Sequence, residues 1–176
     1  AGVVFDVELL ERCEAIRHVD SLQPPFSLIR RESAEHEIPW CAAHRTGVIC
    51  YSPMQSGILT ETFSPARIVR MADDDWRLRS PEFWPPNLER NMALRDALKP
   101  IADRHHTTVS AVAIAWTLAW NGVTGAIVGA RSADQIDGWI DAATLTLTAE
   151  DLRDIAIAIT RTEAGSGPEA PASLAA

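Results

Sequence analysis

The clearest pattern in this chain of 176 residues is GVICYSPMQSGILT, at residues 47–60. Its first five residues, 47–51, form an apolar run of the length that a buried strand usually has. Ser52-Pro53 ends the run, because proline cannot donate to a strand ladder. Residues 54–89 are irregular and rich in Pro, Asp, Arg and aromatic side chains. A connection of that length predicts a functional loop rather than a passive linker.

Helical patterns alternate with short apolar runs on both sides of this strand. Further strands are predicted at Gly2–Phe5, Ser21–Gln23 and Ala126–Gly129. Because helical crossovers join parallel strands, the pattern predicts an α/β fold of about four βα units plus a C-terminal helix. Periodicity alone fits half of a (β/α)₈ barrel or a small open sheet. The helices are predicted at 7–18, 33–44 (with a break or late start at Pro39), 88–105, 109–120, 133–142 and 149–162, with caps at Asp6, Ser33, Thr108, Ser132 and Thr148.

Composition limits the class of protein. The chain is 47% hydrophobic and 23% charged, which is typical of a soluble globular domain. A net charge of −8 and a pI near 5.1 argue against nucleic acid as the main partner. The sequence has no apolar run of the ~20 residues that span a membrane, so we expect no membrane partner. The segment after Thr162 is rich in Gly, Ser, Pro and Ala, which predicts one domain at 1–162 and a disordered tail at 163–176.

The cysteines and histidines give no metal pattern. Cys13, Cys41 and Cys50 lack metal-ligand spacing, and we interpret them as apolar side chains in a reducing cytoplasm. The pair His105-His106 would point to different sides of a helix. We therefore expect a cytoplasmic protein without a metal site.

Three stretches resemble the aldo-keto reductase family. They are residues 20–29 (DSLQPPFSLI, followed by Arg31-Glu32), residues 47–60 quoted above, and residues 126–136 (AIVGARSADQI). Their order and spacing are similar too, and 109–120 resembles the family's long helix before its last strand. The family is a (β/α)₈ TIM barrel that reduces aldehydes and ketones with NADPH. The resemblance implies a partial barrel, with strands five to eight in residues 1–162.

The resemblance also implies a cofactor site, because ligands of such barrels bind at the carboxyl ends of the strands. Gln23 would hydrogen-bond the nicotinamide carboxamide, and the Tyr51 ring would stack on the nicotinamide. Ser52, Met54 and Ser56 match the loop over the pyrophosphate, where hydroxyl and N–H groups suit phosphate oxygens.

The segment after the last predicted strand matches the adenosine end of the family's site. Gly129, Arg131 and Gln135 lie there, and a guanidinium suits a 2′-phosphate, which favours NADP over NAD. Two features depart from the family. Residues 2–6 lack the Ser-Asn pair that usually ends the fifth strand. Trp139 replaces an adenine-binding Asn, and its indole could cover adenine or simply pack.

The family's catalytic Asp, Tyr, Lys and His belong to its first four strands and their loops. This chain contains one tyrosine, Tyr51, and one lysine, Lys99. Tyr51 matches the stacking position and Lys99 falls in a predicted helix. The resemblance therefore assigns no catalytic residue to this chain, and we expect the isolated chain to be inactive.

Three readings remain open from the sequence. The first is an NADP-dependent oxidoreductase acting on a small carbonyl substrate, completed by a missing N-terminal half or by homo-oligomer formation. The second is a non-catalytic dinucleotide-binding or regulatory half-barrel, and the third is a fragment without function. Trp76, Phe83 and Trp84 could line an apolar substrate pocket or form a lid packed on the barrel.

Overall fold

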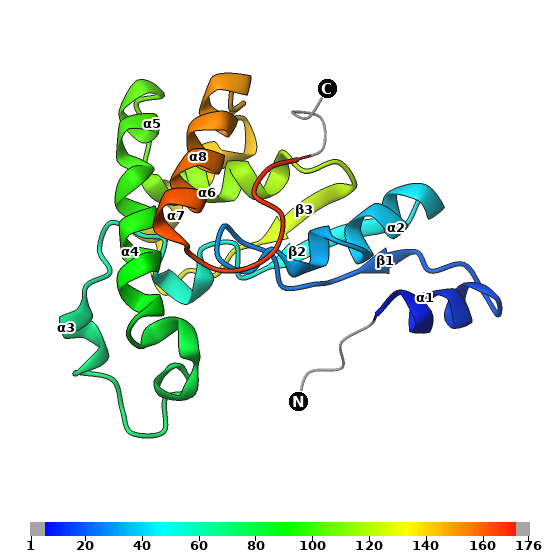
Figure 1. The fold of residues 1–176 in the computed structure, drawn as a ribbon, viewed down its shortest axis with the longest axis horizontal. Coiled ribbons are helices and arrows are strands. Elements are labelled where there is room, and N and C mark those ends of the chain that lie inside the picture. The colour runs from blue at the N-terminus through cyan, green and yellow to red at the C-terminus, as the bar shows by residue number, and fades with distance from the viewer. Residues whose placement is uncertain (1–5, 172–176) are drawn as a thin grey trace.

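The structure, a computed structural model, describes residues 6–171 and contains a small parallel sheet with helices packed against it (Figure 1). The strand predicted at Gly2–Phe5 lies outside the described residues. The elements are, in chain order, α1 (Val7–Glu14), β1 (Ser21–Leu22), α2 (Glu37–His44), β2 (Gly47–Tyr51), α3 (Pro65–Ile68), α4 (Asn87–Ala97), α5 (Lys99–Arg104), α6 (Val109–Leu118), β3 (Val123–Ile127), α7 (Ala133–Asp137) and α8 (Ala149–Thr162).

The sheet has the order β1-β2-β3, and both neighbouring pairs are parallel. β3 begins and ends earlier than the predicted run 126–129. Val48 pairs with Val123 but Ile49 pairs with Gly125, so Thr124 is an extra residue in the ladder. The Thr124 hydroxyl accepts the N–H of Val48 at 3.2 Å and thus replaces a backbone carbonyl at the irregularity. The parallel strands with helical crossovers confirm the expected α/β fold.

The two faces of the sheet are buried to different extents. Val48 and Cys50 point toward the helices and are fully buried. On the other face of the sheet, Tyr51 is 41% exposed, and its register partner Ile127 is 45% exposed. In a barrel this face would point to the interior. The exposed face that carries Tyr51 and Ile127 is the one that half of a barrel would leave uncovered.

Helix α6 forms the centre of the core. Its sequence, VSAVAIAWTL, contains no charged residue, and all of its residues from Val109 to Thr117 are buried. Trp116 packs between Phe26 and Trp120, with ring centroids 5.5 and 5.3 Å away. The helix is therefore packed on most of its sides, which its uncharged sequence allows.

Three of the predicted helix caps form. The side chains of Asp6 and Thr108 accept N–H groups three residues ahead, and Thr148 forms a reciprocal capping box with Asp151. Ser132 occupies the predicted cap position of α7 without making a side-chain hydrogen bond.

Two predicted helices have different bounds because of proline. The cap predicted at Ser33 is wrong: Ser33 lies in a 3₁₀ turn, and the helix begins late, at Glu37. Pro39 therefore falls in the first turn of α2, where its missing N–H breaks no helical bond. The helix predicted at 88–105 is divided at Leu98 into α4 and α5, and Pro100 occupies the first turn of α5.

The segment after α8 is tied down, although its composition predicts disorder. Figure 1 shows the chain crossing the molecule after α8 as a strap, which we define as residues 163–171. Arg31 N–H donates to the Ser166 carbonyl at 2.9 Å, and Ser166 N–H donates to the Ile29 carbonyl at 3.1 Å. The buried Arg31 guanidinium also donates to the Ala164 carbonyl at 3.1 Å. The strap is held by hydrogen bonds with a segment more than 130 residues earlier in the chain, and local composition does not show these bonds.

Strap packing also explains one glycine. A Cβ on Gly165 would lie 1.9 Å from the Ile29 carbonyl oxygen, and its φ of +64° disfavours other residues as well. Burial lowers the pKa of the Arg31 guanidinium, because loss of water destabilises its charged form. The carbonyl oxygens that accept its hydrogen bonds offset this cost.

Two of the three cysteines, Cys41 and Cys50, are fully buried, and all three are free thiols. Burial raises the pKa of Cys41 to about 11 and that of Cys50 to about 12. Within residues 6–171 no cluster of His, Cys, Asp and Glu side chains is suited to hold a metal ion. The helices of this same part are also too short or too polar to cross a bilayer.

Candidate functional site

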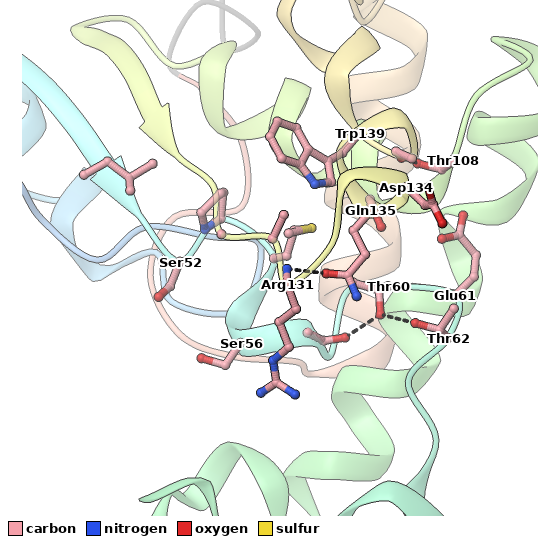
Figure 2. Close-up of a pocket in the computed structure, with 18 of the residues that line it drawn as sticks. Ser52, Ser56, Thr60, Glu61, Thr62, Thr108, Arg131, Asp134, Gln135 and Trp139 are labelled. Atoms are coloured by element: carbon pink, nitrogen blue, oxygen red, sulfur yellow. Dashed lines mark hydrogen bonds between the residues drawn. The ribbon is translucent and has the colours of Figure 1, made fainter.

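A cavity of about 690 Å³ lies at the carboxyl ends of β2 and β3 (Figure 2). Its walls come from the loop after β2, the start of α6 and the segment from β3 through α7. Its lining residues are Tyr51, Ser52, Pro53, Met54, Ser56, Gly57, Thr60, Glu61, Thr62, Arg67, Arg77, Thr108, Ser110, Ile127, Gly129, Ala130, Arg131, Asp134, Gln135, Gly138 and Trp139.

All the residues predicted to bind cofactor except Gln23 line this cavity. They are Tyr51, Ser52, Met54, Ser56, Gly129, Arg131 and Gln135. Gln23 is exposed beyond the end of β1 and lies outside the cavity. Strand β1 is nevertheless tied to the site, since the Tyr51 N–H donates to the Pro24 carbonyl at 3.0 Å. Residues far apart in the sequence thus converge because the strands are parallel.

The loop after β2, residues 52–57, has an unusual backbone. Ser52, Gln55 and Ser56 have φ values of 58°, 44° and 52°, and Gly57 has 102°. A non-glycine residue in this region costs on the order of 1–3 kcal/mol, and such residues gather at ligand sites. Within residues 6–171 the N–H groups of Met54 and Ser56 donate to no backbone carbonyl. Free N–H groups in a loop of this kind suit an anion.

Gln55 holds this loop in place. The side chain is 6% exposed, and its Oε1 accepts the Ser27 hydroxyl at 2.9 Å. The same Ser27 oxygen accepts the N–H groups of Ile29 and Arg30, so the loop is anchored to the segment after β1. Sequence reasoning missed Gln55, because a glutamine in a loop carries no local signal that it is buried.

Three guanidinium groups line the cavity, from Arg67, Arg77 and Arg131. Arg77 is paired with Asp75, with Nε 2.9 Å from Oδ1. Hydrogen bonds from Arg77 lower the pKa of Asp75 to about 2, and the positive charge of Arg131 acts in the same direction. Arg131 thus lies within electrostatic reach of the 75–77 segment. Figure 2 shows its side chain extending into the open cavity.

The Arg131 backbone is held by its own helix. The Arg131 N–H donates to Gln135 Oε1 at 2.8 Å, one turn ahead (Figure 2). Gln135 therefore fixes the start of α7, and the arginine side chain stays available for a ligand. Arg131 and Gln135 were both predicted from the sequence, but their mutual contact was not.

The end of the cavity near α6 contains residues that the sequence analysis did not single out as ligands. Glu61 accepts the Val109 N–H at the start of α6, and the Thr108 hydroxyl donates to the Gly138 carbonyl. Asp134 lies near Glu61 and Thr108 at this end (Figure 2), and Ser110, two residues after Thr108, also lines the cavity. These residues come from three separate segments without a common motif, so only the fold could bring them together.

The aromatic residues considered for a substrate pocket do not form one within the described chain. Phe83 is fully buried and packs edge-on against Phe63 and Trp76. Trp76 and Trp84 are 57% and 46% exposed and lie outside the cavity. Phe83 is therefore a core residue, as the packing alternative predicted.

Comparison with known proteins defines the class. Residues 2–160 match the Aldo/keto reductase family, and the chain belongs to that family. It is 26% identical to aldo-keto reductase YhdN of Bacillus subtilis (strain 168) over 152 residues, which are 86% of this chain and 45% of that protein. It is 27% identical to probable aldo-keto reductase 1 of Glycine max over 149 residues, 84% of this chain and 42% of that protein.

A solved structure confirms the partial barrel. The glycerol dehydrogenase AKR11B4 from Gluconobacter oxydans superposes with a TM-score of 0.83 at 26% identity. The match covers 93% of this chain and 49% of that one. The chain therefore spans about half the length of the relatives it matches, as expected for the second half of a (β/α)₈ barrel.

Proposed function

We propose that this chain is the cofactor-binding half of an NADP-dependent aldo-keto reductase, an oxidoreductase that reduces aldehydes or ketones by hydride transfer. The observation that supports this most is the strained loop 52–57, which lies with Tyr51 and Arg131 around one cavity. Free N–H groups and a guanidinium favour phosphate oxygens, and an exposed aromatic ring favours a planar heterocycle.

The residues present fit NADP(H). Ser52, Met54 and Ser56 would hold the pyrophosphate, Arg131 the 2′-phosphate and the Tyr51 ring the nicotinamide. Gln23 shares the exposed sheet face with Tyr51 by strand alternation, so a contact to the carboxamide remains our prediction. When bound, NADPH supplies the hydride for carbonyl reduction.

We propose that the proton donor comes from outside residues 1–176. Tyr51 is the chain's sole tyrosine. Lys99, the sole lysine, pairs with Asp96 at 3.0 Å and does not line the cavity. A missing general acid removes a rate factor of about 10²–10⁴. We therefore propose that turnover of a small carbonyl substrate requires an N-terminal half, and that the chain alone is inactive.

The open sheet face points to the same requirement. Tyr51 and Ile127 are 41% and 45% exposed on a sheet face that a closed barrel would cover. An N-terminal half or a second copy of this chain would cover them. Free thiols at Cys41 and Cys50 agree with the cytoplasmic location that we propose for the protein.

A second function also fits these residues. The lack of a second tyrosine and a second lysine favours a non-catalytic dinucleotide-binding or regulatory half-barrel. The two proposals differ in one result: the regulatory half-barrel binds NADPH but reduces no aldehyde when an N-terminal half of a related reductase is supplied.

The cofactor assignment is tested by titrating the protein with NADPH and NADH and following the quenching of protein fluorescence. We expect NADPH to bind more tightly, and Arg131→Ala to remove most of that preference. Tyr51→Ala should weaken NADPH binding about three- to tenfold, while Tyr51→Phe keeps the ring and the affinity. Equal affinity of wild type and Tyr51→Ala would exclude the stacking role.

A further inference from the structure

A buried segment, residues 26–31, follows β1 and lies between the loop 52–57 and the strap. Five of its six residues are at most 3% exposed, and Arg30 is the exposed one. A backbone hydrogen bond joins its first residue to the end of β2, and two others join its last part to the strap. The strap itself does not line the cavity. The segment therefore connects the strap to the candidate cofactor site.

Ser27 gives this segment a fixed shape. Its hydroxyl oxygen accepts the N–H groups of Ile29 at 3.2 Å and Arg30 at 3.1 Å, and its own N–H donates to the Arg30 carbonyl at 3.0 Å. The single hydroxyl proton is donated to Gln55 Oε1 in the loop 52–57. The proton and both lone pairs are thus in use. A shift of Ile29 or Arg30 therefore moves the group that holds Gln55.

The loop depends on this contact. Within residues 6–171, Ser27 is the one residue distant in sequence that forms a hydrogen bond with the loop 52–57. Three non-glycine residues of the loop have positive φ values, and such conformations persist only where their surroundings hold them. The position of Ser27 therefore affects whether the N–H groups of the loop stay available to phosphate oxygens.

Arg31 joins the other end of the segment to the strap. Its guanidinium donates to the Leu28 carbonyl of its own segment. It also donates to two strap carbonyls, those of Ala164 at 3.1 Å and Gly167 at 3.3 Å. One buried side chain thus fixes the segment and the strap to each other.

Two glycines let the strap pack closely on the segment. A Cβ on Gly165 would overlap the Ile29 carbonyl oxygen, and one on Gly167 would lie 2.5 Å from the Arg31 carbonyl carbon. These neighbours are backbone atoms, so they cannot move aside as the end of a flexible side chain can. Gly165 and Gly167 also have φ values of 64° and 97°, which suit glycine. A larger residue at either position therefore has to displace the strap.

We propose that Arg31 is a positioning residue for the cofactor loop, and that docking of the strap raises the affinity of the cavity for NADPH. With the strap docked, Arg31 fixes the segment, Ser27 keeps its place, and Gln55 holds the loop in the conformation that binds the pyrophosphate. This inference rests on the proposed function. Coupling of this kind is reciprocal, so NADPH favours the docked strap by the same factor by which the docked strap favours NADPH.

Hydrogen exchange of the wild type tests the coupling without any substitution. The Ser166 N–H, which donates to the Ile29 carbonyl, reports opening of the strap. Saturating NADPH should slow its exchange about three- to tenfold more than it slows the amides of α1, whose hydrogen bonds are local. Equal slowing in the strap and in α1 would show a general stabilisation and overturn the coupling.

Two variants that loosen the strap test its effect on affinity. Gly165→Ala adds the Cβ that the packing excludes, and Arg31→Lys replaces two donor nitrogens by one. Each should weaken NADPH binding about three- to tenfold in an equilibrium titration. Gly125→Ala is the matched control and should bind like the wild type, because a Cβ there meets no atom within 4 Å. Wild-type affinity in either strap variant would overturn the proposal.

The double variant of Ser27→Ala and Gly165→Ala separates a route through Ser27 from a general loss of stability. If the strap acts through the hydrogen bond of Ser27 with Gln55, Gly165→Ala weakens NADPH binding in the wild type but not in Ser27→Ala. Losses that multiply in the double variant would overturn this route. Circular dichroism of each variant checks that a loss of binding is not a loss of fold.

Failure of the inference and failure of the proposed function are distinguishable. If the wild type binds no NADPH, the proposed function is overturned and the inference with it. If the wild type binds NADPH but the Ser166 N–H gains no protection beyond that of α1, the inference is overturned and the cofactor proposal stands.

Discussion

The loop at residues 52–57 and the junction of α5 with α8 are both polar, but they use their polar groups in opposite ways. In the loop, Ser52, Gln55 and Ser56 hold strained backbone conformations, and some N–H groups have no partner within the described chain. At the junction, the buried Asp151 accepts from Arg104 at 2.7 Å and from His105 at 2.7 Å. Unsatisfied groups are available to a ligand, whereas satisfied ones stabilise the fold.

The junction has little capacity left for a ligand. Asp151 also accepts the Thr148 N–H at 2.9 Å and the Thr148 hydroxyl at 2.8 Å. Burial opposes ionisation of Asp151, but its hydrogen bonds from His105, Thr148 and Arg104 hold the pKa below the ordinary value. A strongly shifted carboxylate is often a sign of an active site. Here the shift is explained by a structural network that ties α8 to α5.

The largest effect is expected for Asp151→Ala. The substitution leaves His105, Arg104 and Thr148 without their shared acceptor, so the free energy of unfolding should fall by about 3–5 kcal/mol. Urea unfolding measures the change, and Asp154→Ala is the control because Asp154 contacts Arg104 from an exposed position. A loss below about 1 kcal/mol would show that the junction contributes little to the fold.

Acid should lower the stability of the protein by protonating Asp151 at the junction. The pKa of Asp151 is lower in the folded state than its unfolded value of about 3.9. Its stabilising contribution is therefore complete above that value and is lost as the pH falls through the folded pKa. Unfolding curves from pH 6 to pH 2 should show less acid destabilisation for Asp151→Asn than for the wild type. Parallel curves for the two proteins would contradict this.

Gln55→Ala should lower both the stability of the protein and its affinity for NADPH, because it removes a buried support of the loop. Ser27 loses its acceptor, and the expected decrease in the free energy of unfolding is about 1–3 kcal/mol. NADPH affinity should fall as well, since the loop is no longer anchored. Gln23→Ala, at an exposed glutamine whose side chain makes no hydrogen bond within residues 6–171, serves as the stability control and should leave the unfolding curve unchanged. Equal unfolding curves for both variants would exclude the anchoring role of Gln55.

Ser56→Gly should have the smallest effect on stability. It should leave stability unchanged or raise it slightly, but it should lower the affinity for NADPH. Glycine adopts a φ of 52° without strain, so the free energy of unfolding should be unchanged or rise by up to about 1 kcal/mol. The affinity for NADPH should decrease because the hydroxyl is lost and the loop gains freedom. Ser56→Ala separates the two causes, since it removes the hydroxyl and keeps the strain. A destabilised Ser56→Gly would show that the backbone is not strained there.

Much of the fold could be predicted from local pattern. The run at 47–51 is β2 as predicted, and the caps at Asp6, Thr108 and Thr148 are where the sequence places them. These features depend on short-range chemistry, such as side-chain acceptors near the first turn of a helix. Strand β3 was placed too late because the Thr124 irregularity depends on its neighbour β2.

The residues of the candidate site also fall into two groups, those that a local motif predicts and those that only tertiary contacts reveal. Tyr51, Ser52, Met54, Ser56, Gly129, Arg131 and Gln135 lie in two continuous stretches that resemble family motifs, so the sequence could name them. Gln55 was missed because its importance comes from a partner 28 residues away. Glu61, Ser110 and Asp134 were missed because their meaning appears only when three segments meet.

The sequence by itself determined the parallel α/β pattern, the family and the two loops that line the cavity, because those features lie in contiguous residues. The tertiary structure alone decided that Ser110 and Glu61 lie at the end of the cavity, that Phe83 belongs to the core and that the strap is ordered. The physical reason is that a hydrogen bond or a buried surface between distant segments leaves no mark in either segment alone. Arg31 shows this most clearly, since two of its guanidinium acceptors, the carbonyls of Ala164 and Gly167, lie 133 and 136 residues further along the chain.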